Sequence, residues 1–106
     1  GMAVDSIISE GTILSGSRVY DSVLGRNIKV NSYCDIRDSI IFDKVEIGRE
    51  CKIRRAIIDK YVRIPAKTLI GYDLQNDKQF YHVTESGIVV IPRREQRGNL
   101  NDTWSS

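Results

Sequence analysis

The chain has 106 residues and a formal net charge of +2. This length suits one domain, and so small a charge, with no basic cluster interleaved with aromatic residues, argues against a nucleic-acid-binding protein. No apolar run approaches the roughly 20 residues of a membrane span and no secretory signal is visible, so a cytoplasmic location with no membrane partner is expected.

A 17-residue repeat organises the chain from Ile7 to Gly71, and residues 1–6 are expected to be a lead-in to it. Large aliphatic residues recur in three columns: Ile7, Leu24, Ile41 and Ile58; Ile13, Val30, Ile47 and Ile64; and Val19, Ile36, Ile53 and Ile70. Two positions before most of them stands a small or β-branched residue, and a spacing of two keeps both side chains on one face of a strand. The repeat therefore predicts short strands that each point two side chains inward.

Three such strands per repeat, in one register over four repeats, predict a coil. The columns follow one another in steps of six, five and six positions, and hexapeptide periods are typical of a parallel β-helix whose coils stack at about 4.8 Å. The alternative is an ordinary β-sandwich, which needs turn signals every roughly 8 to 12 residues. We therefore expect an all-β parallel β-helix of about four coils over residues 1–71, followed by a capping extension over residues 72–106.

The two cysteines, Cys34 and Cys51, stand one repeat apart in the same column. They are expected to be inward neighbours that act as small apolar residues. A disulfide is compatible with their spacing, but nothing else in the sequence indicates an oxidising compartment. Two cysteines with no nearby histidine do not make a zinc site, so no metal is expected.

One outward column is apolar, whereas the other outward positions are mostly charged. It contains Val23, Ile40 and Ile57, with Phe42 beside it. An apolar stripe on the outside of a solenoid is either covered by a partner or prone to aggregation. We predict that this face packs on another domain or subunit. The alternative is a set of surface aliphatic residues favoured only by their strand propensity.

After Gly71 the repeat stops. A turn is expected at Asn76-Asp77, a short element at residues 79–81, a buried strand at residues 87–91 that ends before Pro92, and a frayed terminus from residue 98. The only histidine, His82, lies outside the coils and is expected to be structural.

No phosphate-binding loop, paired-carboxylate site or nucleophile elbow is present in the sequence. The chain alone is therefore not expected to be a complete enzyme. The best ligand-binding candidates are Arg93, Arg94 and Arg97, since guanidinium groups bind phosphate as a fork. Lys60 would join them in an anion pocket if the tail folds back. The alternative is a solvated basic tail.

The order of several segments resembles one family. These segments are 15–17, 23–24, 30–34, 47–55, 57–60, 64–65, 70–71 and the Gly-Ile-Val-Val of residues 87–90. Together they resemble the C-terminal domain of bacterial glucose-1-phosphate adenylyltransferase (ADP-glucose pyrophosphorylase) over nearly the whole chain. Single hexapeptide units are shared by many acyltransferases, so the resemblance depends on the order of the segments, the short middle step and the ending.

The resemblance implies a left-handed coil and a catalytic domain outside this chain. In that family an N-terminal domain makes ADP-glucose and pyrophosphate from ATP and glucose 1-phosphate, with Mg²⁺, in glycogen biosynthesis. The β-helix packs on that domain, helps to build a homotetramer and contributes to allosteric regulation. The chain is therefore expected to be the regulatory and oligomerisation domain of a nucleotidyltransferase, with no cofactor and no catalytic residue of its own.

The resemblance also implies a sugar-phosphate effector site between the two domains. The family uses a basic residue of the last full coil and two arginines after the final strand, which match Lys60, Arg93 and Arg97. Lys60 stands where an arginine is expected, which keeps the charge but loses the guanidinium fork. The effector stays open among fructose 1,6-bisphosphate, fructose 6-phosphate and other sugar phosphates.

Two other functions are alternatives. A hexapeptide acyltransferase using acetyl-CoA usually needs a histidine in or beside a coil, and this sequence has none there. A stand-alone assembly module would use the apolar stripe and bind no ligand.

Overall fold

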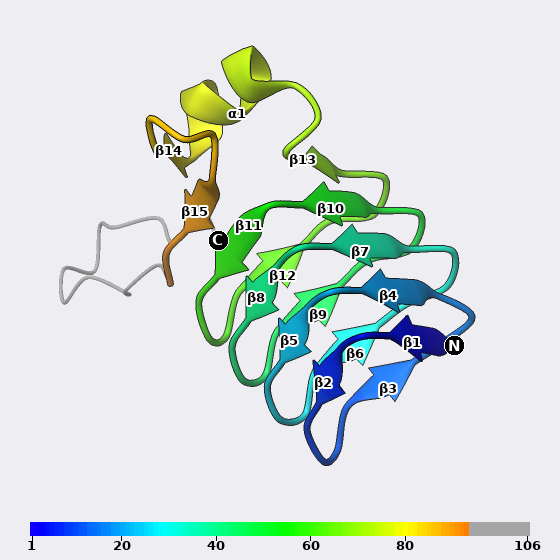
Figure 1. Ribbon diagram of the computed structural model, residues 1–106. Helices are drawn as coiled ribbons and strands as arrows, with labels where there is room; N and C mark the ends of the chain where they lie inside the picture. The colour runs from blue at the N-terminus through cyan, green and yellow to red at the C-terminus, as the bar shows by residue number, and fades with distance from the viewer. Residues whose placement is uncertain (94–106) are drawn as a thin grey trace, which may run out of the picture.

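The structure is a computed structural model that describes residues 1–93. The chain forms a parallel β-helix whose sides are three sheets (Figure 1). Sheet A contains β1 (Met2–Val4), β4 (Arg18–Tyr20), β7 (Asp35–Arg37), β10 (Lys52–Arg54) and β13 (Leu69–Ile70). Sheet B contains β2 (Ile7–Ile8), β5 (Val23–Leu24), β8 (Ile40–Ile41), β11 (Ala56–Ile58), β15 (Val89–Ile91) and β14 (His82–Val83). Sheet C contains β3 (Ile13–Leu14), β6 (Lys29–Val30), β9 (Glu46–Ile47) and β12 (Arg63–Ile64).

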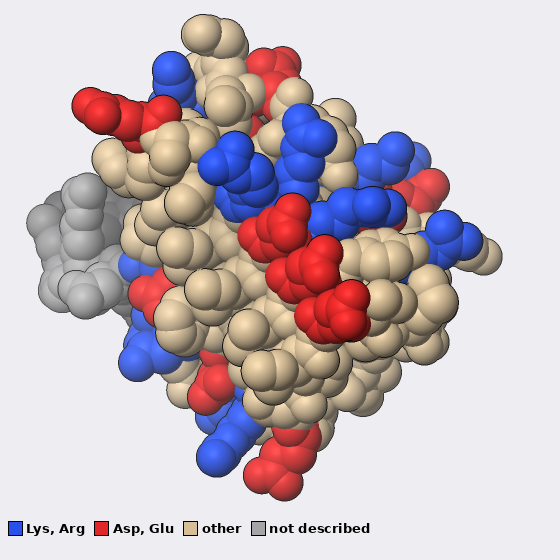
Figure 2. Space-filling view, in the orientation of Figure 1, with Lys and Arg blue, Asp and Glu red and all other residues tan. Residues whose placement is uncertain are grey.

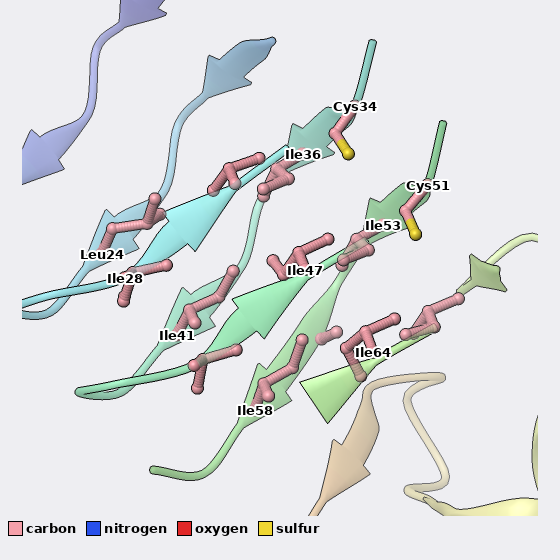
Figure 3. Close-up of a cluster of buried hydrophobic side chains, with 14 of the residues drawn as sticks. Leu24, Ile28, Cys34, Ile36, Ile41, Ile47, Cys51, Ile53, Ile58 and Ile64 are labelled. Carbon is pink, nitrogen blue, oxygen red and sulfur yellow. The ribbon is translucent and has the colours of Figure 1, made fainter. Parts of the chain in front are cut away.

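Each coil gives one strand to each sheet, and the coils pair in parallel. The register between β7 and β10 joins Ile36 to Ile53, so the two strands are offset by one full repeat. The same offset recurs between β8 and β11 and between β9 and β12. The sequence repeat thus becomes stacked inward columns, and Figure 3 shows their aliphatic side chains packed inside the coils. The predicted all-β parallel solenoid of about four coils is confirmed.

The first coil differs from the sequence prediction by one residue. Ile7 pairs with Val23 and Ile13 pairs with Lys29, so both point outward, with 65% and 58% of their surface exposed. Ile8 and Leu14 take the inward positions instead. The offset from the first coil to the second is thus one residue shorter than the repeat. A slip of one residue turns a side chain to the other face of a strand.

The expected lead-in is also wrong, because β1 is already part of the first coil. Met2 pairs with Arg18 and Val4 with Tyr20 at the edge of sheet A. Three short parallel pairings at the start of the chain, one in each sheet, therefore form a complete first coil.

Buried serines satisfy backbone groups at the corner between sheets A and B. The backbone N–H of Ser39 donates to Ser22 Oγ at 3.1 Å, and that of Ala56 donates to Ser39 Oγ at 3.2 Å. Ser39 Oγ in turn donates to the carbonyl oxygen of Arg37 at 2.7 Å. Each hydroxyl thus links its own coil to the next one. Small polar residues occupy this column because a buried backbone N–H needs an acceptor.

Removing the Ser39 hydroxyl is expected to destabilise the fold. Ser39→Ala leaves the buried N–H of Ala56 without its acceptor, which costs about 1–2 kcal/mol of unfolding free energy. Ser86→Ala is the control, because Ser86 is exposed and its Oγ contacts the Thr84 hydroxyl at 3.1 Å, where water can replace it. Urea unfolding of both variants checks this, and an equal loss at the two sites would contradict it.

The chain turns at each corner through a residue with positive φ. At the corner between sheets A and B these residues include Asp21, Asp38 and Arg55, with φ of 50°, 46° and 50°. The N–H of Asp38 donates to the carbonyl oxygen of Tyr20 one coil back, and that of Arg55 donates to Arg37. The left-handed conformation is therefore stabilised by a hydrogen bond between coils, which lets residues other than glycine occupy it.

A fifth coil starts with β13 and is completed by β15, and a cap is inserted between them. β15 pairs in parallel with β11, with Ile91 opposite Ile58. The inserted segment holds α1 (Leu74–Phe80) and β14, which pairs antiparallel with β15. The strand expected at residues 87–91 is present at Val89–Ile91, whereas the turn expected at Asn76-Asp77 lies inside α1.

Candidate functional site

The corner between sheets B and C at the last coils brings two of the predicted basic residues together. Lys60 follows β11 and Arg93 follows β15; since Ile58 pairs with Ile91, Arg93 stands in the position that Lys60 has one coil earlier. Asp59 joins the two segments: its Oδ1 accepts the Lys60 N–H at 2.7 Å and its Oδ2 accepts the Arg93 N–H at 3.4 Å. The backbone beside both cations is therefore tied to one carboxylate.

The Tyr61 ring contacts two of the cations at this corner. The Arg93 guanidinium lies 4.5 Å from the centre of the Tyr61 ring, and Lys44 Nζ lies 5.4 Å from it. Tyr61 turns with a φ of 63°, and its N–H donates to the carbonyl oxygen of Asp43. Cation–π contacts of this kind hold a guanidinium in place without neutralising it. Among residues 1–93, the ion pairs that form involve neither Lys44, Lys60 nor Arg93.

Charges alternate along this corner and the alternation ends at the last coil. Backbone bonds from residues 27, 44 and 61 to residues 10, 26 and 43 show that the corner positions stack. The stacked residues are Glu10, Arg26, Asp43, Lys60 and then Arg93. Acid and base therefore alternate until two cations follow one another. Two adjacent cations that form no ion pair within residues 1–93 favour the binding of an anion.

The third predicted site residue, Arg97, lies outside the described residues, as does Arg94. The structure thus places Lys60 and Arg93 at one corner. The sequence analysis missed Tyr61 and Lys44 at this corner. Their positions follow from the period of the repeat, since Lys44 and Tyr61 stand one repeat apart in the sequence.

The predicted apolar stripe lies on the outer face of sheet B. Val23 and Ile40 are exposed, and Ile57 is partly buried. Register pairing extends the stripe to Ile7 at one end and Val90 at the other. Phe42 is exposed as well and lies just beyond β8. We call Ile7, Val23, Ile40, Ile57 and Val90 the sheet B stripe.

The two cysteines lie side by side in the core, as expected from their column, and both are free thiols (Figure 3). The Sγ of Cys34 donates to the Gly48 carbonyl and that of Cys51 to the Pro65 carbonyl, each at 3.0 Å. A hydrogen bond with Cys34, together with burial, raises the pKa of Cys51. Cys51 is therefore a neutral thiol at physiological pH and not a reactive thiolate.

Residues 1–93 hold no group of three or more His, Cys, Asp or Glu side chains arranged to bind a metal ion. His82 is exposed, and its strand partner is Val90. In the same described part of the chain, no helix has the length and apolar character needed to cross a membrane.

Comparison with known proteins places this architecture in a family. The model of the GlmU-like C-terminal hexapeptide family matches residues 1–91, which includes all four full coils and β15. The chain belongs to this family. Membership in a hexapeptide-repeat family agrees with the left-handed coil that the sequence resemblance implies.

Several curated relatives of this chain are glucose-1-phosphate adenylyltransferases. The chain is 57% identical over 93 residues to a glucose-1-phosphate adenylyltransferase of an Anaeromyxobacter species, covering 88% of this chain and 23% of the relative. It is 50% identical over 93 residues to that of Koribacter versatilis, covering 88% and 22%. It is 45% identical over 95 residues to that of Aliivibrio fischeri, covering 90% and 24%. The resemblance seen in the sequence is confirmed, and the chain spans less than a quarter of the length of these relatives.

Proposed function

We propose that this chain is the C-terminal regulatory and oligomerisation domain of a glucose-1-phosphate adenylyltransferase. The observation that carries the proposal is the identity of 57% and 50%, over 88% of the chain, to relatives of that name. The parent protein makes ADP-glucose and pyrophosphate from ATP and glucose 1-phosphate in glycogen biosynthesis, in the cytoplasm. The catalytic residues and the Mg²⁺ that they use belong to a domain outside this chain.

The corner of Lys60 and Arg93 is the proposed effector site, together with Arg97. Its ligand is a sugar phosphate, because phosphate oxygens accept charge-assisted hydrogen bonds from ammonium and guanidinium groups. Two observations support this proposal. Lys60 and Arg93 stack on each other and form no ion pair with a carboxylate of residues 1–93, and the Tyr61 ring holds the Arg93 guanidinium in place. An anion that also touches the catalytic domain would favour one interdomain arrangement and thereby change the activity.

The sheet B stripe is the proposed contact with the rest of the protein. Its β-branched side chains form a continuous apolar row along five strands, exposed at Ile7, Val23 and Ile40 and partly buried at Ile57 and Val90. Burying such a row stabilises an interface by roughly 25 cal/mol per Å² of apolar surface. The catalytic domain of the same protein and a neighbouring subunit of a homotetramer are the proposed partners.

The test is an assay of the full-length protein for ADP-glucose formation, with and without fructose 1,6-bisphosphate or fructose 6-phosphate. We expect formation of ADP-glucose that rises with a sugar phosphate. Lys60→Gln, Arg93→Gln and Arg97→Ala are each expected to raise the activator concentration needed by about tenfold or more, since a hydrogen bond to a charged group contributes about 1.5–3 kcal/mol.

Arg63→Gln is the matched control for this assay, because Arg63 is an exposed arginine of sheet C that pairs with Glu46 at 3.7 Å. It should leave activation unchanged. An equal loss of basal and activated rates in the three site variants would count against a regulatory role. Formation of ADP-glucose without any sugar-phosphate response would favour the assembly module. The absence of ADP-glucose under every condition would reopen the acetyl-CoA-dependent acyltransferase.

A further inference from the structure

The fifth coil is interrupted at the corner between sheets A and B. In each preceding coil a left-handed residue leads from the sheet A strand towards the sheet B strand, as Asp38 and Arg55 do. In the fifth coil Gly71 has a positive φ of 87° at the same place, but β13 ends at Ile70 and β15 begins only at Val89, with the cap between them. This corner is therefore open where every earlier coil is closed.

Two consecutive arginines of the fourth coil reach the two ends of this break. The Nε of Arg54 donates to the carbonyl oxygen of Gly71, where β13 ends, at 2.9 Å. The Nη2 of Arg55 donates to the carbonyl oxygen of Ser86, just before β15, at 2.7 Å. The Arg54 guanidinium also lies 4.2 Å from the centre of the Tyr72 ring. Both guanidinium groups are thus held beside the open corner.

These bonds leave most of the donor capacity unused. A guanidinium carries five N–H donors in a planar fork, and each of the two arginines commits one of them to a carbonyl. Because the bonds already restrict the side chains, an anion bound between them would cost less conformational entropy than at a free arginine.

Arg54 and Arg55 keep charges that no ion pair of the described residues neutralises, although Asp38 stands one coil below Arg55 at the same corner. Arg37 is the strand partner of Arg54, but it is paired with Asp35 at 2.7 Å, which raises the pKa of Arg37. Lys52 lies two residues before Arg54 and so on the same outer face of β10. Within residues 1–93, no carboxylate lies at ion-pair distance from Lys52, Arg54 or Arg55. Figure 2 shows Lys and Arg side chains gathered over the upper part of this face, above a row of acidic side chains.

We propose that Arg54 and Arg55 form a binding site for a phosphate group at the open corner of the fifth coil. The ligand is a small molecule with a phosphate or pyrophosphate group, held by the two guanidinium forks, with Lys52 adding positive charge. The site is distinct from the corner of Lys60 and Arg93, which lies between sheets B and C, and it does not depend on the proposed enzyme function.

The test is a titration of the isotope-labelled 106-residue chain with pyrophosphate at constant ionic strength, followed by the Nε–Hε resonances of the arginines. We expect saturable shifts of Arg54 and Arg55 that matched sodium chloride does not produce. The double variant Arg54→Lys with Arg55→Lys keeps the charge but removes both forks, so it should weaken binding about tenfold or more. Because this variant lacks the two reporting side chains, its binding is compared with that of the unaltered chain at the backbone amides of Gly71 and Ser86, whose carbonyl oxygens accept from the arginines.

Two control variants separate this site from its surroundings. Arg63→Lys changes an exposed arginine of sheet C, and Lys60→Gln changes the other basic corner, so each should leave pyrophosphate binding at Arg54 within about twofold. The absence of saturable shifts in the unaltered chain would overturn the proposal and leave the arginines a purely structural role. Equal shifts in sodium chloride, or loss of the shifts in Lys60→Gln, would overturn it as well. The amide spectrum of each variant shows whether it is folded.

Discussion

Replacing Ile41 with alanine is expected to lower the free energy of unfolding by about 3 kcal/mol. Replacing its neighbour Ile40 is expected to lower it by less than about 1 kcal/mol. The two residues form β8, in the middle of the solenoid, and the same atoms are removed in both variants. Urea unfolding of the chain, followed by circular dichroism, gives both values.

The difference between the two variants comes from the face that each residue occupies. Ile41 is 1% exposed and Ile40 is 43% exposed. Ile41 stacks between Leu24 and Ile58, whose strands pair with β8 on both sides. The hydrogen bonds between coils hold the backbone at its spacing, so the structure cannot collapse into the cavity that Ile41→Ala leaves. The variant therefore loses the full free energy that the removed side-chain atoms contributed to folding.

An equal loss at Ile40 and Ile41 would show that the outer face is packed in the isolated chain, and it would contradict the assignment of the sheet B stripe as an open surface. In the full-length protein the expectation differs. There, Ile40→Ala should weaken the proposed contact with the catalytic domain or with a neighbouring subunit, while Ile41→Ala should act through the stability of the β-helix.

The inward columns could be predicted from the sequence because two periods coincide. Side chains two residues apart share a face of a strand, and the 17-residue coil repeats each face in the next coil. In the first coil this reasoning fails at Ile7-Ile8 and Ile13-Leu14. Both positions hold two consecutive aliphatic residues, so hydrophobicity cannot decide which one points inward. The hydrogen-bond register decides it, and that register is a property of the folded chain.

The cap could not be predicted because its helix depends on tertiary contacts. α1 has only seven residues, and isolated helices of this length are unstable in water. Asn76 and Asp77, which were expected to form a turn, favour turns by their local propensity. Likewise, the pairing of Arg54 and Arg55 at the open corner follows from where the fifth coil is interrupted, which no periodicity reveals. The sequence alone places Lys60 beside the arginines only on the condition that the tail folds back, with a solvated basic tail as the alternative, and the family resemblance points to the pocket.

Substitution of Asp77 with alanine is expected to release the cap. Asp77 is 1% exposed, and its Oδ2 accepts the backbone N–H of Gly71 at 2.9 Å. Gly71 follows β13, so this bond fixes α1 to the end of the solenoid. Losing this hydrogen bond between a partly buried N–H and a carboxylate costs about 2 kcal/mol. That loss corresponds to roughly a 30-fold rise in the population of the opened cap.

Amide hydrogen exchange measures this opening residue by residue. In Asp77→Ala, protection should fall at Tyr81, whose N–H donates to the carbonyl oxygen of Asp77, and along β15. The amides of β5 and β8 should keep their protection, because coils in a solenoid contact only their neighbours. Asp77→Asn is the matched control, since its amide oxygen can still accept the Gly71 N–H, and it should lose much less. A uniform loss of protection along all coils would contradict this account, because it would mean that the cap and the coils unfold as one cooperative unit.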